Sequence, residues 1–227
     1  MDAYRRNFLI GASTVLSSTL AAPLGALAAQ PQKKKKEEAE EEVSTNEDLM
    51  REHGVLNRIL LVYDEANRRI VAKEKFDPGL ISKSAGLIKK FIEDYHEKLE
   101  ENYLFPRFEK AGKLVDLVNI LRTQHQAGRN VTDKILASVQ ANDMPAVSSA
   151  MTAFVRMYRP HEAREDTVLF PALHDIVSRH EYDALGEEFD KIEKKTFGQD
   201  GFEWARDQVA TIEKQMGIYD LAQFTPR

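Results

Sequence analysis

The sequence predicts an all-α protein whose main body is an up-and-down antiparallel four-helix bundle with extra short helices at its C-terminal end. Three observations support this prediction. Apolar residues recur at helical spacing from residue 46 onward, the helical stretches are joined by short polar connections, and no stretch alternates between apolar and polar residues as a strand does. The chain has 227 residues, 42% of them apolar, which is enough to bury a core of ordinary size.

Capping residues and prolines mark the bounds of each predicted helix. Thr45 or Asn46 is expected to cap the first helix, which carries an apolar stripe of Leu49, Leu56, Ile59, Leu60 and Tyr63. Asp77-Pro78 begins the second helix and Ala111-Gly112 ends it. The third helical pattern begins at Leu114.

A fourth helix restarts at residues 142–145, which read Asn-Asp-Met-Pro. Two shorter apolar patterns, at 181–195 and 202–216, predict a pair of C-terminal helices. We therefore assign residues 46–178 to the bundle and residues 179–227 to a helical appendage.

Residues 1–29 are predicted to be an export signal. Arg5-Arg6 is followed by Phe8-Leu9 and by an uncharged stretch that ends in Ala26-Leu27-Ala28, a small-x-small cleavage pattern. The arginine pair resembles a twin-arginine signal. A general secretory signal and an uncleaved membrane anchor are the alternatives. We expect a periplasmic or otherwise exported protein that has no membrane contact after cleavage.

Charge and cysteine content exclude several classes of protein. Residues 30–45 form a charged linker, in which Lys33–Lys36 precedes the acidic run Glu37–Glu42. Thirty-two basic and thirty-seven acidic residues give no overall attraction to nucleic acid. The absence of cysteine excludes disulfides, thiolate zinc sites, iron–sulfur clusters and a catalytic thiol. A metal would have to be bound by His, Asp, Glu, Tyr or backbone oxygen.

An internal repeat carries the candidate chemistry. Residues 96–106 (HEKLEENYLFP) align with residues 161–171 (HEAREDTVLFP), and six of the eleven positions are identical. In each copy a histidine is followed four residues later by a glutamate, giving His96 with Glu100 and His161 with Glu165. On a helix these two positions share one face, about 6 Å apart.

Each repeat is preceded by a helix that carries one histidine, His53 in the first helix and His125 in the third. In an antiparallel bundle His53 and His96 are expected at similar heights. Four histidines and two glutamates could then meet in the core. A lone histidine on an apolar helix face is usually a core residue with a backbone partner, and this structural interpretation loses force only when all six positions are considered together.

The pattern resembles the hemerythrin-like, or HHE cation-binding, family, whose members hold two non-haem iron ions inside a four-helix bundle. The resemblance implies that His53, His96, His125 and His161 are terminal iron ligands and that Glu100 and Glu165 bridge two Fe ions. In the invertebrate oxygen carriers of this kind a bridging carboxylate lies five residues after its histidine, so Asp166 is an alternative to Glu165. Manganese and zinc also accept these ligand types, and iron is implied by the resemblance alone.

The sequence departs from the oxygen carriers at one position. They have a further histidine four residues after the one on the third helix, where this chain has Arg129. With four histidines, two bridging carboxylates and a bridging oxygen, two six-coordinate irons would keep two open positions instead of one. This difference puts reversible oxygen carriage in doubt.

Four other residues were considered as ligands. His174 is expected to be a surface or helix-end residue, because it lies over three helical turns beyond His161. His180 is expected to lie in a loop. Tyr158 could supply oxygen but is more typical of a core position. Glu93 forms a single Glu-x-x-His pair, whereas the ferritin-like di-iron fold needs two.

The expected function is the binding of dioxygen, nitric oxide or a related small oxidant at a di-iron site. A redox enzyme that degrades peroxide and a protein of iron handling or nitrosative stress are the alternatives. The partners would be a small diatomic ligand or peroxide and a redox partner that the sequence does not identify.

Overall fold

The computed structural model describes residues 43–226, and within this range every regular element is helical. The all-α prediction is confirmed. The predicted export signal, residues 1–29, lies outside the described residues, as does most of the predicted linker at residues 30–45. Within the described part of the chain, no helix is both long enough and apolar enough to cross a bilayer.

Thirteen helical segments follow one another in the described residues. They are α1 (Thr45–Ala72), α2 (Gly79–Leu87), η1 (Ile88–His96), α3 (Glu97–Leu99), η2 (Glu100–Leu104), α4 (Phe105–Ala111), α5 (Val115–Gln140), α6 (Met144–Arg164), η3 (Glu165–Leu169), α7 (Phe170–Leu173), α8 (Arg179–Phe197), α9 (Gly201–Met216) and η4 (Leu221–Phe224). The segments η1, η2 and η3 are wound as π-helix, and η4 is a short 3₁₀-helix.

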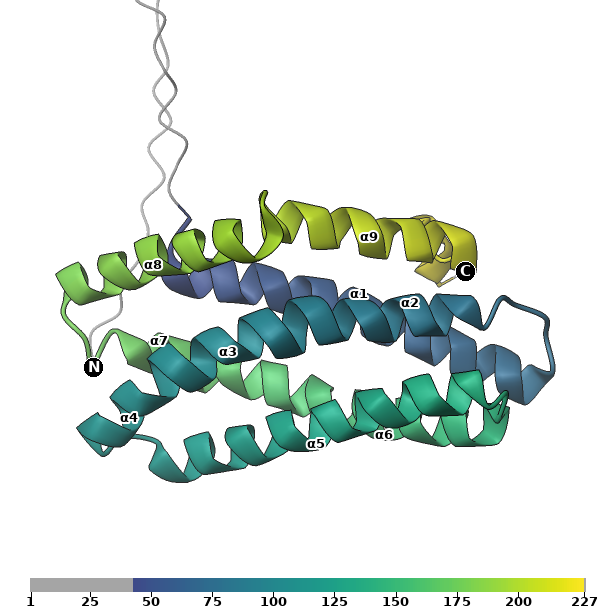
Figure 1. Ribbon diagram of the computed structural model, residues 1–227, viewed down its shortest axis with the longest axis horizontal. Helices are drawn as coiled ribbons and strands as arrows, with labels where there is room; N and C mark the ends of the chain where they lie inside the picture. Colours follow the sequence, from purple (N-terminus) through teal and green to yellow (C-terminus); the bar gives the residue numbers. More distant parts are fainter. Residues whose placement is uncertain (1–42, 227) are drawn as a thin grey trace, which may run out of the picture. The chain divides into compact units, whose positions relative to one another are not determined.

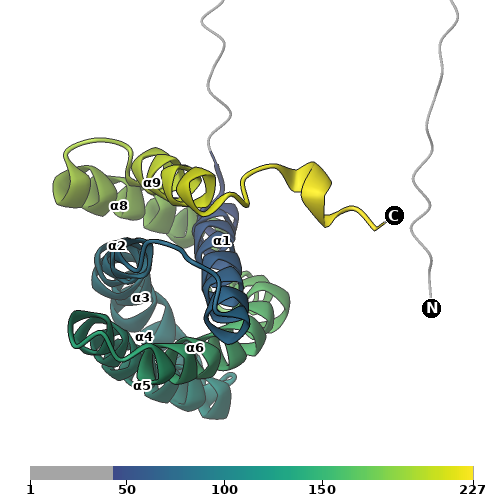
Figure 2. The ribbon, with the colours of Figure 1, turned by 90° about the vertical axis from the view of Figure 1, so that its right-hand side faces the viewer.

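The long helices lie side by side with short connections between them (Figures 1 and 2). Helix α5 packs along α6, α1 packs along α6, and the run from α2 to α4 packs on α5 and α1. Helices α8 and α9 cover the outer side of α1 and α2. The helical bundle is confirmed, whereas the exact four-helix up-and-down topology is not, because π-helical turns divide two of the predicted helices. Helices α8 and α9 lie where the extra C-terminal helices were predicted.

The helix ends follow the predicted capping chemistry with one correction. Ser44, and not Thr45 or Asn46, caps α1, since its hydroxyl accepts the N–H of Glu47. Asp143 caps α6 by accepting the N–H of Ala146. Gly112 ends α4 in the left-handed conformation, with φ 64°, which a residue without Cβ adopts freely.

The two repeats each contain a π-helical turn next to the Leu-Phe-Pro sequence. Pro106 and Pro171 have no N–H to donate to the carbonyl four residues before them, and their rings crowd that carbonyl. The N–H of Phe105 instead bonds the carbonyl of Glu100, five residues back, and the N–H of Phe170 bonds that of Glu165 in the same way. Each π turn therefore begins at a glutamate of the repeat.

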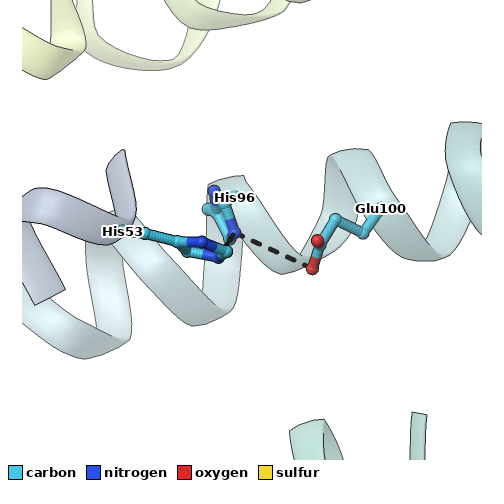
Figure 3. A group of neighbouring side chains, drawn as sticks. All are labelled: His53, His96 and Glu100. Atoms are coloured by element: carbon cyan, nitrogen blue, oxygen red, sulfur yellow. Dashed lines mark hydrogen bonds and ion pairs between the residues drawn. The ribbon is translucent and has the colours of Figure 1, made fainter. Parts of the chain in front are cut away.

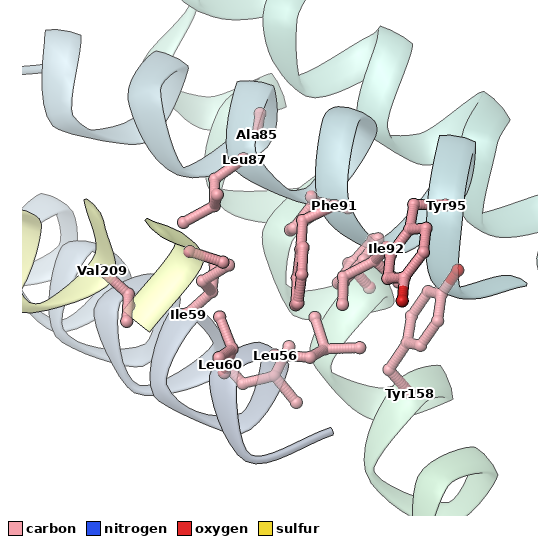
Figure 4. Close-up of a cluster of buried hydrophobic side chains, with 14 of the residues drawn as sticks. Leu56, Ile59, Leu60, Ala85, Leu87, Phe91, Ile92, Tyr95, Tyr158 and Val209 are labelled. Carbon is pink, nitrogen blue, oxygen red and sulfur yellow. The ribbon is translucent and has the colours of Figure 1, made fainter. Parts of the chain in front are cut away.

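An apolar core fills the space between the long helices beside the repeats (Figure 4). Leu56, Ile59 and Leu60 of α1 are buried there with Phe91 and Ile92 of η1. The predicted stripe of the first helix is thus buried, and it extends to Val209 of α9. The buried residues of α1 directly follow His53 in the chain. Their packing against η1 fixes the position of α1, and so of His53, relative to the repeats.

Candidate metal centre

The structure brings together all six residues that the sequence predicted. His53 comes from α1, His96 from the end of η1, His125 from α5 and His161 from α6, while Glu100 begins η2 and Glu165 begins η3. All six side chains are buried, and none is more than 4% exposed. They form two groups of potential metal ligands, His53 with His96 and Glu100, and His125 with His161 and Glu165, and the ligand atoms of each group lie within 4.8 Å of one another.

In the first group, the imidazoles of His53 and His96 point at each other across two helices (Figure 3). Their Nε2 atoms are 3.0 Å apart, and the Oε2 atom of Glu100 lies 3.8 Å from Nε2 of His96. Two nitrogens and one carboxylate oxygen therefore converge on one point between α1 and the run of α2 to α4.

The two glutamates also join the groups to each other. The same Oε2 atom of Glu100 lies 3.4 Å from Nε2 of His125, which belongs to the second group. Conversely, Oε2 of Glu165 lies 3.1 Å from Nε2 of His161 and 3.4 Å from Nε2 of His53. Each carboxylate thus stands between one imidazole of each group, which is where a carboxylate shared by two ions would stand.

Each histidine is oriented by an acceptor on its other ring nitrogen. The Nδ1 atom of His53 lies 2.7 Å from Oδ1 of Asp166, and that of His125 lies 3.1 Å from Oε1 of Glu101. These two acceptors directly follow the glutamates of the repeats.

The remaining two acceptors directly precede a histidine. Glu52 Oε2 lies 2.6 Å from Nδ1 of His96, and Gln124 Oε1 lies 2.9 Å from Nδ1 of His161. When Nδ1 donates its proton to an acceptor, Nε2 is left with a lone pair directed into the cluster, as a metal ligand requires.

Buried oxygens without partners show that the donor set fits a cation. Among the described residues, both carboxylate oxygens of Glu100 and both of Glu165 lack a hydrogen-bond donor, as Nε2 of His125 lacks a partner. Buried polar atoms are normally paired, and a buried carboxylate with no donor is costly. Oxygen and imidazole donors around two points match what iron, manganese or zinc accepts. The residues present therefore fit a pair of metal ions.

The pKa values of the cluster reflect crowded charge in a dry interior. Burial and the nearby charge of Glu165 raise the pKa of Glu100. Burial would raise the pKa of Glu165 as well, but the imidazoles of His161 and His53 lower it. Burial and the neighbouring His53 lower the pKa of His96 and so favour the neutral ring. Burial would lower the pKa of His53 too, but its hydrogen bonds to Asp166 and Glu165 raise it. The cluster thus holds acids and imidazoles whose pKa values are shifted in opposite directions.

Arg129, at the position where oxygen carriers have a fifth histidine, points away from the two groups. Its Nη2 atom donates to Oε2 of Glu97 at 2.6 Å and to Oε1 of Glu101 at 2.7 Å. The hydroxyl of Tyr158 donates to the other oxygen of Glu97 at 2.6 Å. These four residues form a hydrogen-bonded network beside the cluster. The hydroxyl of Tyr158 is therefore bonded to Glu97 and belongs to neither group of potential metal ligands.

The other candidates considered from the sequence lie elsewhere. His174 and His180 are exposed, and the ring of His174 packs against Tyr182 at 4.2 Å between centroids. The prediction of a loop at His180 is wrong, because Ser178 caps α8 and places His180 in its first turn. Glu93 is buried but belongs to none of the ligand groups found in the described residues. Asp166 faces Nδ1 of His53 from outside the cluster, whereas Glu165 stands between the two groups.

Sequence reasoning missed the acceptors that orient the histidines. Glu52 and Gln124 are each the residue before a predicted ligand, and Glu101 and Asp166 are each the residue after one. Their placement repeats in both halves of the chain. A comparison of the residues flanking each predicted ligand, extended from the repeats to the first and third helices, would have marked these four polar positions, but not the histidine that each one orients.

Comparison with known proteins agrees with this geometry. The family model described as the hemerythrin HHE cation binding domain matches residues 44–173 and, in a second and overlapping match, residues 116–214. Three curated relatives, each printed as an uncharacterized protein, are 52% identical over 193 residues, covering 82% of this chain and 76% of the relative. They are Mb2018 of Mycobacterium bovis (strain ATCC BAA-935 / AF2122/97), and MT2051 and Rv1995 of Mycobacterium tuberculosis (strains CDC 1551 / Oshkosh and ATCC 25618 / H37Rv).

No solved structure matches the chain. The family model covers more than half of the residues, including every member of the His and Glu cluster. The chain therefore belongs to the hemerythrin HHE cation-binding family.

Proposed function

We propose that this protein binds two iron ions and, through them, dioxygen, nitric oxide or a related small oxidant. The observation that carries the proposal is the pair of unpartnered carboxylates, Glu100 and Glu165, each lying between one imidazole of each ligand group. In this proposal His53 and His96 hold one ion and His125 and His161 hold the other. Bound iron would supply coordination positions open to small ligands and a change of oxidation state.

The helices that carry these ligands support the finer architecture expected from the sequence. We propose that four helical units form an up-and-down bundle, each of which is called a rod here. They are α1, the segment α2–α4, α5, and the segment α6–α7. Helices α8 and α9 would then be an addition to the outside. In this arrangement each rod contributes one histidine to the site.

Iron content and gas uptake test the proposal. The purified protein should contain two iron atoms per chain, and the reduced protein should take up dioxygen or nitric oxide in a fixed ratio to its iron, with a change in visible absorption. His96→Ala should lower the iron content to one atom or fewer, because it removes an imidazole from the first group. His180→Ala is the matched control, since His180 is exposed, and it should retain both atoms.

Less than one iron per chain in the unaltered protein, or equal iron content in His96→Ala and the unaltered protein, would refute the metal site. Reversible release of the bound gas, in a fixed ratio to the iron, would favour a role as a gas carrier over a role as an enzyme.

A redox enzyme acting on peroxide is the second candidate, and the placement of Arg129 favours it. Position 129 holds an arginine, which bonds Glu97 and Glu101, and not a fifth histidine. Two coordination positions on the ions would therefore be left for small ligands. Steady consumption of added hydrogen peroxide by the iron-loaded protein, abolished in His96→Ala and kept in His180→Ala, would support this function. A loaded protein that leaves peroxide unchanged would exclude it.

We propose further that residues 1–29 direct the protein out of the cytoplasm. The arginine pair and the small-x-small pattern support this proposal. Replacement of Arg5 and Arg6 by lysine should retain the full-length chain in the cytoplasm, whereas the unaltered chain should appear in the exported fraction, shortened by the signal. Equal distribution of the two chains would contradict a twin-arginine route.

A further inference from the structure

The two metal positions differ in the charge behind their histidines. The acceptor of His96 Nδ1 is the carboxylate of Glu52, whereas the acceptor at the corresponding place in the other half, at His161 Nδ1, is the neutral amide of Gln124. Glu52 directly precedes His53 and Gln124 directly precedes His125, so the two acceptors occupy the same place in each half of the chain. The halves are alike in geometry at this point, but the acceptor in the first half is a carboxyl group that can ionise and the acceptor in the second half is an amide that cannot.

Cation pairing increases this difference. Glu101, the acceptor of His125 Nδ1, is also paired with Lys98 at 2.6 Å and with Arg129 at 2.7 Å, so part of its negative charge is neutralised. Asp166, which occupies the same role toward His53, has no ion pair within residues 43–226 other than that histidine. The imidazoles of the first group therefore face two carboxylates that no Lys or Arg pairs with, and those of the second group face one neutralised carboxylate and one amide.

Glu52 is in an environment that a bound cation would improve. It is 0% exposed, its Oε1 atom lacks a hydrogen-bond donor among the described residues, and His96 is its single ion-pair partner there. A buried carboxylate without a compensating charge is unfavourable. A dication on Nε2 of His96 would supply the missing positive charge through the ring and strengthen the bond between Nδ1 and Glu52.

From these contacts we propose that the position formed by His53 and His96 binds its metal ion first and more tightly than the position formed by His125 and His161. Glu52 and Gln124 are the positioning residues that set this order. The inference rests on the proposed function, because it requires that both positions bind a metal. Loss of an orienting carboxylate typically lowers metal affinity by about 10- to 100-fold, so an amide in its place sets the expected size of the difference.

A zinc titration of the metal-free full chain tests the order without any turnover measurement. Competition with a chromophoric chelator should give two dissociation constants that differ by about 10-fold or more. In nitrogen NMR spectra of the imidazoles, half an equivalent of zinc per chain should shift the resonances of His53 and His96 before those of His125 and His161. Simultaneous shifts of all four rings would overturn the proposal.

Two matched variants assign the effect to the named residues. Glu52→Gln keeps an acceptor for Nδ1 but removes the charge, and it should weaken the tighter constant by about 10-fold while leaving the other unchanged. Gln124→Glu should strengthen the weaker constant. Both variants should remain helical by circular dichroism. If Glu52→Gln alters neither constant, or weakens both equally as a packing defect would, the proposal fails.

The titration also separates failure of this inference from failure of the proposed function. An unaltered chain that binds neither zinc nor iron would refute the metal site itself. A chain that binds two ions with equal affinity, and whose variants do the same, would refute the order of binding alone.

Discussion

At the scale of single residues, the cluster depends on a close approach between α5 and α6 at Gly128. A Cβ atom at this position would lie 2.0 Å from the hydroxyl of Tyr158, which is too close for any real contact. The missing side chain lets Tyr158 cross α5 and donate to Glu97. Gly128 is therefore a packing requirement of the network beside the metal positions.

Gly128→Ala is expected to destabilise the protein by about 1–3 kcal/mol, because Tyr158 must move and Glu97 loses one of its two donors, keeping Arg129. Gly86→Ala is the control, since a Cβ there meets nothing within 4 Å, and it should stabilise α2 by about 0.5–1 kcal/mol. Urea unfolding of the metal-free chains measures both. Equal stability of Gly128→Ala and the unaltered protein would mean that α5 and α6 can separate without cost.

At the scale of helices, the π turns of η2 and η3 determine how Glu100 and Glu165 are oriented toward the histidines. Pro106 removes the N–H that would close an α-helical bond to the carbonyl of Asn102, and the chain makes the wider turn from Phe105 to Glu100 instead. Restoring the N–H would let this turn revert to α-helix and would rotate Glu100 relative to His96.

Pro106→Ala should therefore lower the affinity for the first metal by about 10-fold, although it adds a backbone donor and should not lower the melting temperature of the metal-free chain. Pro145→Ala, at the first turn of α6 where no π turn depends on it, should leave the affinity unchanged. Chelator competition gives the affinities, and scanning calorimetry gives the melting temperatures. An unchanged affinity in Pro106→Ala would show that the π turn is not needed for binding.

The pair of helices α8 and α9 carries a buried acid whose ionisation should make stability depend on pH. Glu193 is 8% exposed, and its Oε1 atom accepts the N–H of Phe202 at 2.8 Å. Burial raises its pKa from an ordinary value of 4.5 to about 7. The unfolded chain therefore releases this proton at lower pH than the folded chain does, so the stability present below pH 4.5 is lost as the pH rises toward 7.

Glu193→Gln keeps the acceptor for Phe202 but cannot ionise, so it should not lose this stability. We expect the difference in melting temperature, variant minus unaltered chain, to be about 2–4 °C larger at pH 8 than at pH 5. Melting curves of the metal-free chains at the two pH values provide the comparison. A difference that is the same at both would contradict a buried ionisation at this position.

At the scale of the whole molecule, metal ions at the two positions would connect residues from α1, η1, α5 and α6. An ion that binds the folded chain alone stabilises it by about 2.7 kcal/mol at a concentration 100 times its dissociation constant. Loading with iron or zinc should raise the melting temperature by about 5–10 °C, and a chelator should reverse the change. The metal-free chain should stay helical, because the long helices bury a large apolar core that contains no metal ligand.

A metal-free chain that unfolds at room temperature would show that the core is insufficient alone. A melting temperature that does not respond to metal would argue against binding at the cluster.

Much of the fold and of the cluster could be predicted because both depend on periodic features. Helical spacing and capping residues marked the long helices, and the repeat of His96 with Glu100 in His161 with Glu165 marked the ligand groups. The orienting role of Glu52 could not be predicted in the same way, because a residue beside a ligand on a helix projects about 100° away from it. Its partner, His96, comes from a neighbouring helix, and that pairing depends on tertiary packing.

The π turns escaped prediction for a different reason. A proline in a helical pattern indicates a bend or an end, and the sequence does not say which carbonyl the neighbouring N–H will choose. The apolar pattern of α1 begins several residues after its cap, so the sequence does not distinguish Ser44 from Thr45 and Asn46 as the capping residue. These differences lie at helix ends and turns, where one residue of shift alters the bonding without altering the fold.

Each glutamate contacts an imidazole of the other ligand group, and these reciprocal contacts give the cluster a two-fold arrangement. Glu100 reaches across to His125, and Glu165 reaches across to His53, both at 3.4 Å. Each half of the chain supplies two histidines and one glutamate, and each glutamate also approaches an imidazole of the other half. Two copies of one half, related by a two-fold axis, would present the same six groups. The six groups are therefore arranged as in a symmetric dimer of helical hairpins, although they belong to one chain. Because both halves lie in one chain, corresponding positions can hold different residues, as Glu52 and Gln124 do.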